Sequence, residues 1–200
     1  MSKLFLITIA VIALLFGAWL YHNTHQAPAK PQLAAATIFT QARTISPFQL
    51  TDANQKSLTL ENFKGHWSLV FFGFTNCPDL CPTTLATLNQ AYKKLETAHI
   101  KLPQVLFISV DPDRDDPEQM HEYLSSFNPH FLGATGQQTQ IDQLTHELSV
   151  LYTKTTNQNQ VSIDHSGTIL IINPQGQFYG VFTTPHDANK IAQDMQQIMS

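Results

Sequence analysis

Two residues with reactive side chains, Cys77 and Cys81, are separated by three residues in the segment Cys-Pro-Asp-Leu-Cys-Pro at 77–82. We expect a helix to begin at Pro82, because a proline deeper inside a helix would remove a hydrogen bond of the helical ladder. The segment 77–81 then forms the turn before this helix. Both sulfurs therefore face a helix N-terminus, whose partial positive charge favours the thiolate. Two such thiolates are suited to disulfide exchange or to metal binding.

Cys77 and Cys81 are the only cysteines in the chain, and this count excludes a four-cysteine zinc site and a disulfide-rich mini-protein. A structural disulfide is the ordinary alternative for two cysteines in an exported protein. A bridge that closes so short a loop removes little entropy from the unfolded chain, so stability is a weak reason for it. The spacing therefore favours redox or metal chemistry, with a Cys77–Cys81 disulfide as the oxidised form.

The elements that must position these cysteines follow from hydrophobic periodicity and turn residues. Buried strands are predicted from continuous apolar runs, and helices from apolar residues at 3.6-residue spacing. In one of these helices, Ile141, Leu144, Leu148 and Leu151 are expected on a single buried face. The predicted elements are a hairpin over 48–60, a strand over 67–74, a helix over 82–97, a strand over 105–110, a helix capped by Asp116, a helix over 139–151, a hairpin over 168–182 and a helix over 187–199. This order predicts an α/β fold of the thioredoxin-like type, with a central sheet flanked by helices.

His165 precedes the predicted strand at 168–172. In a thioredoxin-like sheet this position lies beside the cysteine turn, where ordinary thioredoxins carry a cis-proline, and no proline occurs here between Lys154 and Asn173. Two thiolates and an imidazole form a soft three-coordinate set that suits Cu(I) and also holds Cu(II). Zinc accepts the same donors, but a structural zinc site needs a fourth protein ligand. The alternative for His165 is a surface or capping residue.

An acidic segment, 111–116, follows the second buried strand at the same end of the predicted sheet. We interpret Asp115 and Asp116 as turn and helix-cap residues. Asp111, at the end of the strand, is close enough in this arrangement to tune the metal loop or to contact a docking partner.

Three segments, GFTNCPDLCP at 73–82, SVDPDRDDPE at 109–118 and VSIDHSGTILIINPQGQF at 161–178, resemble the Sco/SenC family of copper-binding proteins. The resemblance runs from about residue 46 to the C-terminus. It implies a thioredoxin-like fold, copper bound by Cys77, Cys81 and His165, and a role in assembling the copper centre of cytochrome c oxidase. The segment Gly-Ala-Thr-Gly at 133–136 departs from the usual Leu-Thr-Gly of the family and touches no proposed ligand.

Two functions of different classes follow from these observations. The first is a copper chaperone that delivers its metal to the apo copper-centre subunit of cytochrome c oxidase, with other copper chaperones or thiol reductants as further partners. The second is a thiol–disulfide reductase that keeps the cysteines of that target reduced, in which one cysteine attacks and the other resolves the mixed disulfide. A peroxiredoxin is excluded, because its motif requires proline at Val70 and serine or threonine at Phe74.

The N-terminal region carries eighteen residues without charge, 4–21, and Trp19 and Tyr21 lie at the end of this run. We expect an uncleaved transmembrane anchor over 1–21, a flexible tether over 22–41 and the copper-binding domain over 42–200. The alternative is a cleaved signal peptide, for which Ala27-Pro28-Ala29 offers a cleavage site. With an uncleaved anchor, we expect a single-pass protein of a bacterial inner membrane, with the copper-binding domain in the periplasm.

The composition of the chain excludes two further classes of protein. Hydrophobic residues make up 42% of the chain, which excludes an intrinsically disordered protein. Fifteen acidic residues against eleven basic ones give a net charge of −4, so no basic field exists to bind nucleic acid.

Overall fold

The computed structural model describes residues 3–24, 32–157 and 160–200. The chain divides into two compact units, and the second unit begins at Leu33. The first unit contains helix α1, Lys3–Thr24. The sequence predicts a membrane-spanning helix in this region, whereas no helix within the described residues is long and apolar enough to cross a bilayer. The alternative cleavage site at 27–29 lies outside the described residues.

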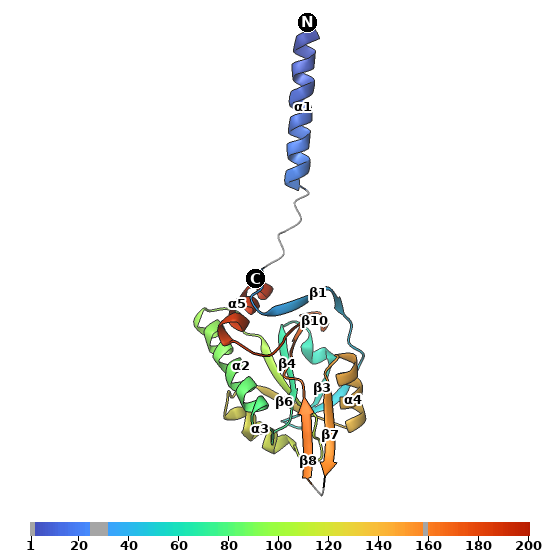
Figure 1. Ribbon diagram of the computed structural model, residues 1–200, viewed down its shortest axis with the longest axis vertical. Coiled ribbons are helices and arrows are strands. Elements are labelled where there is room, and N and C mark those ends of the chain that lie inside the picture. The colour runs from blue at the N-terminus through green and yellow to red at the C-terminus, as the bar shows by residue number, and fades with distance from the viewer. Residues whose placement is uncertain (1–2, 25–31, 158–159) are drawn as a thin grey trace. The chain divides into compact units, whose positions relative to one another are not determined.

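The second unit, Leu33–Ser200, is built on an eight-stranded mixed sheet (Figure 1). Its strand order is β1-β10-β9-β4-β5-β6-β2-β3. The strands are β1 (Ala36–Arg43), β2 (Gln49–Asp52), β3 (Ser57–Thr59), β4 (Ser68–Gly73), β5 (Gln104–Ser109), β6 (Leu132–Thr135), β9 (Ile169–Ile172) and β10 (Phe178–Phe182). Strands β7 (Tyr152–Asn157) and β8 (Gln160–His165) form a separate two-stranded sheet.

The centre of the large sheet is the parallel pair β4 and β5, and every residue of β4 is buried. A strand covered on both faces needs apolar side chains in both directions, which explains the nearly continuous apolar run of β4. Strand β9 pairs with β4 on its other side in the antiparallel direction. Because β4 and β5 run in parallel, the segments that follow them leave the same edge of the sheet, and the cysteine turn is one of these segments.

Helices cover both faces of the sheet. On one face, α2 (Leu80–Thr97), α3 (Pro117–Ser125) and α5 (Ala188–Met199) pack their apolar sides onto a core that includes Phe71 and Phe107. On the other face, α4 (Gln138–Glu147) and the short helix η1 (Leu60–Phe63) pack around Phe72 and Ile108. The predicted α/β class and the predicted cap at Asp116 are confirmed. Asp187 caps α5 in the same way.

The predicted tether extends too far toward the C-terminus, because its last residues belong to the folded unit. Strand β1 begins at Ala36 and pairs with β10. The backbone N–H groups of residues 34–36 donate to the buried carboxylate of Asp194 in α5, at 2.7 to 2.8 Å. This Ala-rich segment has no apolar period, so it is ordered by a carboxylate about 160 residues away rather than by its own pattern.

The helix predicted over 139–151 ends at Glu147, four residues earlier than expected. Ser149 adopts a left-handed backbone with φ of 57°, which ends the helix and turns the chain. Leu148 is buried as predicted, but Leu151 is 77% exposed. The strand β6 and the hairpin β7–β8 also lie outside the predicted elements.

Candidate metal centre

The cysteine segment connects the end of β4 to α2, and its helix begins earlier than predicted. Helix α2 starts at Leu80 rather than at Pro82, so Cys81 is the second residue of the helix. Pro82 is tolerated as the third residue because the first four N–H groups of a helix have no partner within the helix. The N–H of Cys81 instead donates to Sγ of Cys77 at 3.4 Å. Cys77 therefore receives a hydrogen bond from the start of α2, which fixes the position of its sulfur.

Gly73, the last residue of β4, makes room for the sulfur of Cys81. A Cβ at position 73 would lie 2.5 Å from Sγ of Cys81 and 2.8 Å from the ring of Phe107, closer than carbon side chains approach. Gly73 was not among the site residues predicted from the sequence. A glycine inside a strand is itself a signal for a close approach, so the residue was open to prediction.

His165 is the last residue of β8, rather than a residue of a loop, and its strand partner is Tyr152 in β7. Nδ1 lies 3.2 Å from the carbonyl oxygen of Ser166, to which it donates when it carries the ring proton. In that tautomer Nε2 has a free lone pair on the side of the sulfurs. The rings of Phe71 and Phe74 lie 5.7 and 5.8 Å from the imidazole, centroid to centroid, and enclose it on its apolar sides.

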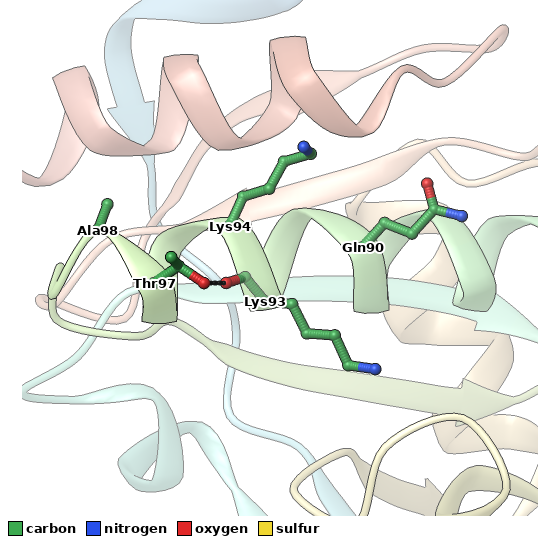
Figure 2. Close-up of a pocket in the computed structure, with 5 residues that line it drawn as sticks. All are labelled: Gln90, Lys93, Lys94, Thr97 and Ala98. Carbon is green, nitrogen blue, oxygen red and sulfur yellow. Dashed lines mark hydrogen bonds between the residues drawn. The ribbon is translucent and has the colours of Figure 1, made fainter.

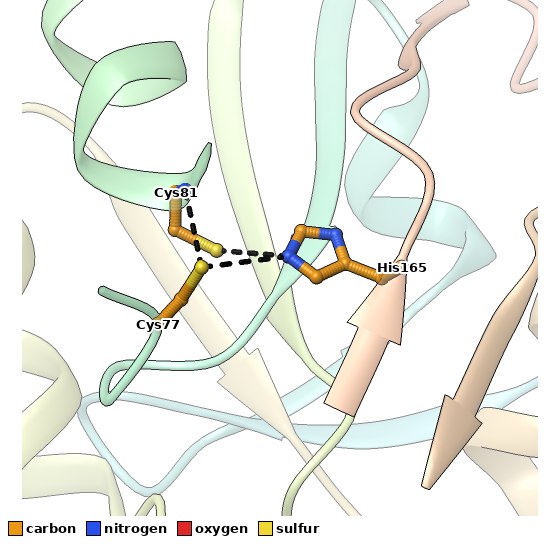
Figure 3. Close-up of side chains that lie close together, drawn as sticks. All are labelled: Cys77, Cys81 and His165. Atoms are coloured by element: carbon orange, nitrogen blue, oxygen red, sulfur yellow. Dashed lines mark hydrogen bonds between the residues drawn. The ribbon is translucent and has the colours of Figure 1, made fainter. Parts of the chain in front are cut away.

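The structure brings the two cysteines and the histidine together (Figure 3). Nε2 of His165 lies 3.2 Å from Sγ of Cys81 and 3.8 Å from Sγ of Cys77, and all three atoms lie within 4.8 Å of one another. Both cysteines are free. A metal ion with bonds of about 2.0–2.3 Å to nitrogen and sulfur holds three donors roughly 3.5–4 Å apart. The donor spacing therefore fits a three-coordinate ion with little movement.

Burial keeps two of these three groups neutral. Cys81 is fully buried, and this burial is the main cause that raises the pKa of its thiol far above the ordinary value. The neighbouring Cys77 raises it further, although a backbone hydrogen bond with Phe74 opposes the shift. Burial also lowers the pKa of His165, so its imidazole is neutral at pH 7. A neutral imidazole is the form that binds metal.

The acidic segment 111–116 contacts both the hairpin that carries His165 and the segment that carries the cysteines. Asp111 is buried and forms ion pairs with Arg114 and Lys154, and it is not part of the cluster of three metal-ligand atoms. Because Lys154 belongs to β7, Asp111 connects its loop to the hairpin that carries His165. A tuning effect of Asp111 on the metal stays a prediction.

Asp115, interpreted from sequence as a turn residue, has a further contact with the cysteine segment. It is buried and accepts hydrogen bonds from the N–H and hydroxyl of Thr75, at 2.9 and 2.6 Å. It also accepts one from the hydroxyl of Ser109 at 2.6 Å. Asp115 thus fixes the backbone two residues before Cys77, and its charge contributes to the raised pKa of the Cys81 thiol. Sequence spacing alone carries no signal for this contact.

An open groove of about 560 Å³ lies on the C-terminal half of α2 (Figure 2). Its lining residues are Gln90, Lys93, Lys94, Thr97 and Ala98. This set has no thiol, imidazole or carboxylate, and the cysteines lie at the opposite end of the same helix. The groove is therefore separate from the candidate metal centre.

Comparison with known proteins places this geometry in a family. The SCO1/SenC family model matches residues 37–200. The human mitochondrial protein SCO2 homolog is 36% identical over 189 residues, which cover 92% of this chain and 70% of the human protein. The crystal structure of Arabidopsis thaliana ScoI with copper bound has a TM-score of 0.71 and 33% identity, covering 76% of this chain and 95% of that one. Bradyrhizobium japonicum ScoI with copper bound has a TM-score of 0.68 and 35% identity, covering 76% and 97%. The chain belongs to the SCO1/SenC family.

Proposed function

We propose that this protein binds one copper ion through Sγ of Cys77, Sγ of Cys81 and Nε2 of His165. The observation that carries the proposal is the convergence of these three atoms within 4.8 Å from two different parts of the chain. Copper-bound structures of relatives at 33% and 35% identity support the choice of metal. Two soft sulfur donors and a neutral imidazole are the ligand types that copper selects.

The two cysteines hold the metal unequally. Cys81 is fully buried, whereas Cys77 is half-buried and is therefore the more accessible of the two sulfurs. An incoming ligand from another protein reaches the copper from the side of Cys77. Cys77 is therefore the first ligand to be exchanged, and Cys81 the last.

The copper is cargo in this proposal, and its recipient is the apo copper-centre subunit of cytochrome c oxidase. Support comes from membership of the SCO1/SenC family and from the three-ligand site, which leaves a coordination position for an acceptor ligand. Other copper chaperones and thiol reductants are further partners, because the site must be filled and its sulfurs kept reduced.

A second function, thiol–disulfide reduction, is favoured by the hydrogen bond from the N–H of Cys81 to Sγ of Cys77. A thiolate at Cys77 would attack a disulfide of the target and release one target thiol. The thiol of Cys81 would then resolve the mixed disulfide, so that the target gains two electrons and this protein becomes the Cys77–Cys81 disulfide.

The proposed setting is a bacterial inner membrane, with the first unit as a single-pass anchor and the domain in the periplasm. This part of the proposal is supported by the uncharged run 4–21, which at 1.5 Å per residue in a helix nearly crosses a hydrocarbon core of about 30 Å. Sequencing the N-terminus of the mature membrane-bound protein tests it. A mature chain that begins near Lys30 would show that the segment is a cleaved signal.

Copper titration of the reduced full chain tests the main proposal. We expect about one copper per chain and, with Cu(II), a thiolate charge-transfer absorption in the visible range. His165→Ala should weaken Cu(II) binding and bleach this band, but both thiols should still form a disulfide. His146→Ala, which removes an exposed histidine of α4, is the matched control and should behave like the wild type.

The same variants separate the chaperone from the reductase in cells. Under copper limitation, His165→Ala should lose oxidase activity nearly as fully as Cys77→Ser or Cys81→Ser. Wild-type oxidase levels with His165→Ala, and none with either cysteine variant, would favour the reductase. A reduced protein that stays colourless and copper-free after dialysis against Cu(II) would exclude the copper proposal.

A further inference from the structure

A second histidine, His186, lies in the segment Thr-Thr-Pro-His-Asp at 183–187, which connects β10 to α5. Its side chain is half-buried, and its Nε2 lies 2.5 Å from the carbonyl oxygen of Gly167. A carbonyl oxygen only accepts hydrogen bonds, so Nε2 carries the ring proton and donates it. Burial lowers the pKa of His186, so the imidazole is neutral at pH 7 and Nδ1 carries no proton. His186 therefore has one donor, and it is bonded to the backbone of another segment.

The carbonyl that His186 holds belongs to the turn directly after the proposed ligand His165. In the same turn, the N–H of Ser166 donates to the carbonyl oxygen of Leu151, the residue before β7, at 2.9 Å. The carbonyl oxygen of Ser166 lies 3.2 Å from Nδ1 of His165. The residue that supplies the acceptor for the ligand imidazole is thus held by its own N–H on one side and by His186 on the other.

Gly167 is also the point at which this turn meets the start of α2. It is buried, and a Cβ at this position would lie 2.6 Å from Cγ2 of Thr184 and 3.1 Å from Cδ1 of Leu80. Leu80 directly precedes Cys81. Only a glycine permits so close an approach of backbone to its neighbours. The turn is therefore packed tightly against both the segment 183–187 and the end of the helix that carries Cys81.

We propose that His186 is a positioning residue for the metal ligand His165. This inference rests on the proposed function. The hydrogen bond from His186 fixes the backbone at Gly167, and this keeps the carbonyl of Ser166 directed at Nδ1 of His165. Nδ1 then holds the ring proton, and the lone pair of Nε2 is available on the side of the sulfurs. Groups that orient a ligand histidine through its second ring nitrogen are part of how a metal site obtains its affinity.

The hydrogen bond matters because His165 has a second neutral tautomer. With its proton on Nε2, the imidazole would donate toward the sulfurs, 3.2 and 3.8 Å away, and would offer no lone pair to a metal. Burial keeps the imidazole neutral but does not select between two neutral forms. The carbonyl of Ser166 makes that selection, and its effect depends on its direction. Loss of the donor at His186 should therefore populate the wrong tautomer.

Two substitutions at position 186 separate the hydrogen bond from the packing. The amide N–H of glutamine lies about as far from the backbone as Nε2 of histidine, whereas the amide of asparagine lies near the position of Nδ1. His186→Gln should therefore keep the hydrogen bond to Gly167, and His186→Asn should lose it. Two-bond proton–nitrogen NMR spectra of the reduced, metal-free full chain in detergent identify the tautomer of His165. We expect the Nδ1–H form in the wild type and in His186→Gln, and a mixture of both forms in His186→Asn.

Cu(II) titration of the same variants measures the effect on the metal site. We expect His186→Asn to bind Cu(II) about tenfold more weakly than the wild type, and His186→Gln to bind it with nearly the wild-type affinity. His146→Ala, in the exposed last turn of α4, should change neither the tautomer of His165 nor the affinity. Urea denaturation of each variant verifies that it is folded under the conditions of the titration.

The outcomes distinguish this inference from the function on which it rests. A wild-type His165 with its proton on Nε2, or equal tautomer populations in the wild type and His186→Asn, would overturn the proposal. A His186→Gln variant that behaves like His186→Asn would also overturn it, because the donor would then not be the property that matters. The tautomer is measured without copper. A wild type that binds no copper, with tautomers that respond to His186 as expected, would refute the proposed function and leave the positioning role intact.

Discussion

Two regions of the domain bury ionisable side chains in opposite ways. The carboxylates of Asp194 and Asp115 are fully buried, and each accepts three hydrogen bonds from neighbouring groups. Cys81 is fully buried and His165 is half-buried, each with fewer hydrogen bonds than these carboxylates, and burial shifts the pKa of each toward the neutral form. Saturated hydrogen bonding makes a buried carboxylate a structural element. Uncompensated burial leaves neutral donors whose favourable charge partner is a metal ion.

Asp194→Ala removes a buried carboxylate that accepts three hydrogen bonds, and it should cause the largest loss of stability. Three backbone N–H groups at residues 34–36 would lose their acceptor, so we expect the free energy of unfolding to fall by about 3 kcal/mol. Copper affinity should not change, because the carboxylate binds the start of β1 and not the metal loop. Urea denaturation measures the loss. Asp187→Ala, at the exposed cap of the same helix, should have a smaller effect. An unchanged midpoint for Asp194→Ala would mean that water satisfies these groups equally well.

Gly73→Ala should disturb the packing around Sγ of Cys81, one of the proposed metal ligands. The added Cβ would overlap with Sγ of Cys81 and the Phe107 ring, so we expect about 2 kcal/mol of destabilisation together with weaker copper binding. Gly133→Ala is the matched control, since its Cβ would overlap with Leu124 and Met120 and with neither cysteine. It should lower stability and leave copper affinity unchanged. Equal copper affinities in wild type and Gly73→Ala would show that the sulfur position is not constrained by residue 73.

The pH dependence of copper binding reports on the protonation of the buried thiol. The pKa of the Cys81 thiol is raised, so this group is protonated at neutral pH and must release its proton when copper binds. The pKa of His165 is lowered, so its imidazole is neutral at pH 7 and copper displaces no proton from Nε2. Copper affinity should therefore rise about tenfold per pH unit for each thiol proton displaced. Competition titrations between pH 6 and pH 8 measure this slope, and an affinity independent of pH would contradict the buried neutral thiol.

Lys154→Gln should have the smallest effect. It removes one of the two ion-pair partners of the buried Asp111, while Arg114 remains, so we expect a loss of about 1 kcal/mol in stability. Copper affinity should fall slightly, because the hairpin of His165 loses a contact with the sheet. Asp113→Asn removes only the exposed partner of Lys154 and serves as the control. A loss as large as that of Asp194→Ala would show that the hairpin depends mainly on this ion pair.

The elements with strong local patterns were predictable from the sequence. Strand β4, the hairpin β9–β10 and the capped helices α3 and α5 follow directly from apolar runs, turn residues and cap residues. The three proposed ligands were found because reactive residue types are few in this chain. The prediction that these three side chains lie close together depended on the thioredoxin-like order of the elements.

The parts that were not predictable depend on contacts between distant residues. Strand β1 is ordered by Asp194, and the hairpin β7–β8 lies in its own small sheet with polar residues such as Lys154 and Thr155. Helix α2 begins two residues early because Pro82 is harmless in a first turn. The end of α4 was not predicted because Leu148 and Leu151 keep helical spacing. The left-handed turn at Ser149 carries no glycine, which is the usual sequence signal for such a turn.

X-ray absorption of the copper-loaded full chain tests the three-ligand copper site, because it counts the atoms bound to the metal. We expect two sulfur ligands and one imidazole nitrogen in the wild type, loss of the imidazole signal in His165→Ala, and an unchanged spectrum in His146→Ala. A wild-type spectrum without sulfur ligands, or an imidazole signal that persists in His165→Ala, would contradict a copper site formed by Cys77, Cys81 and His165.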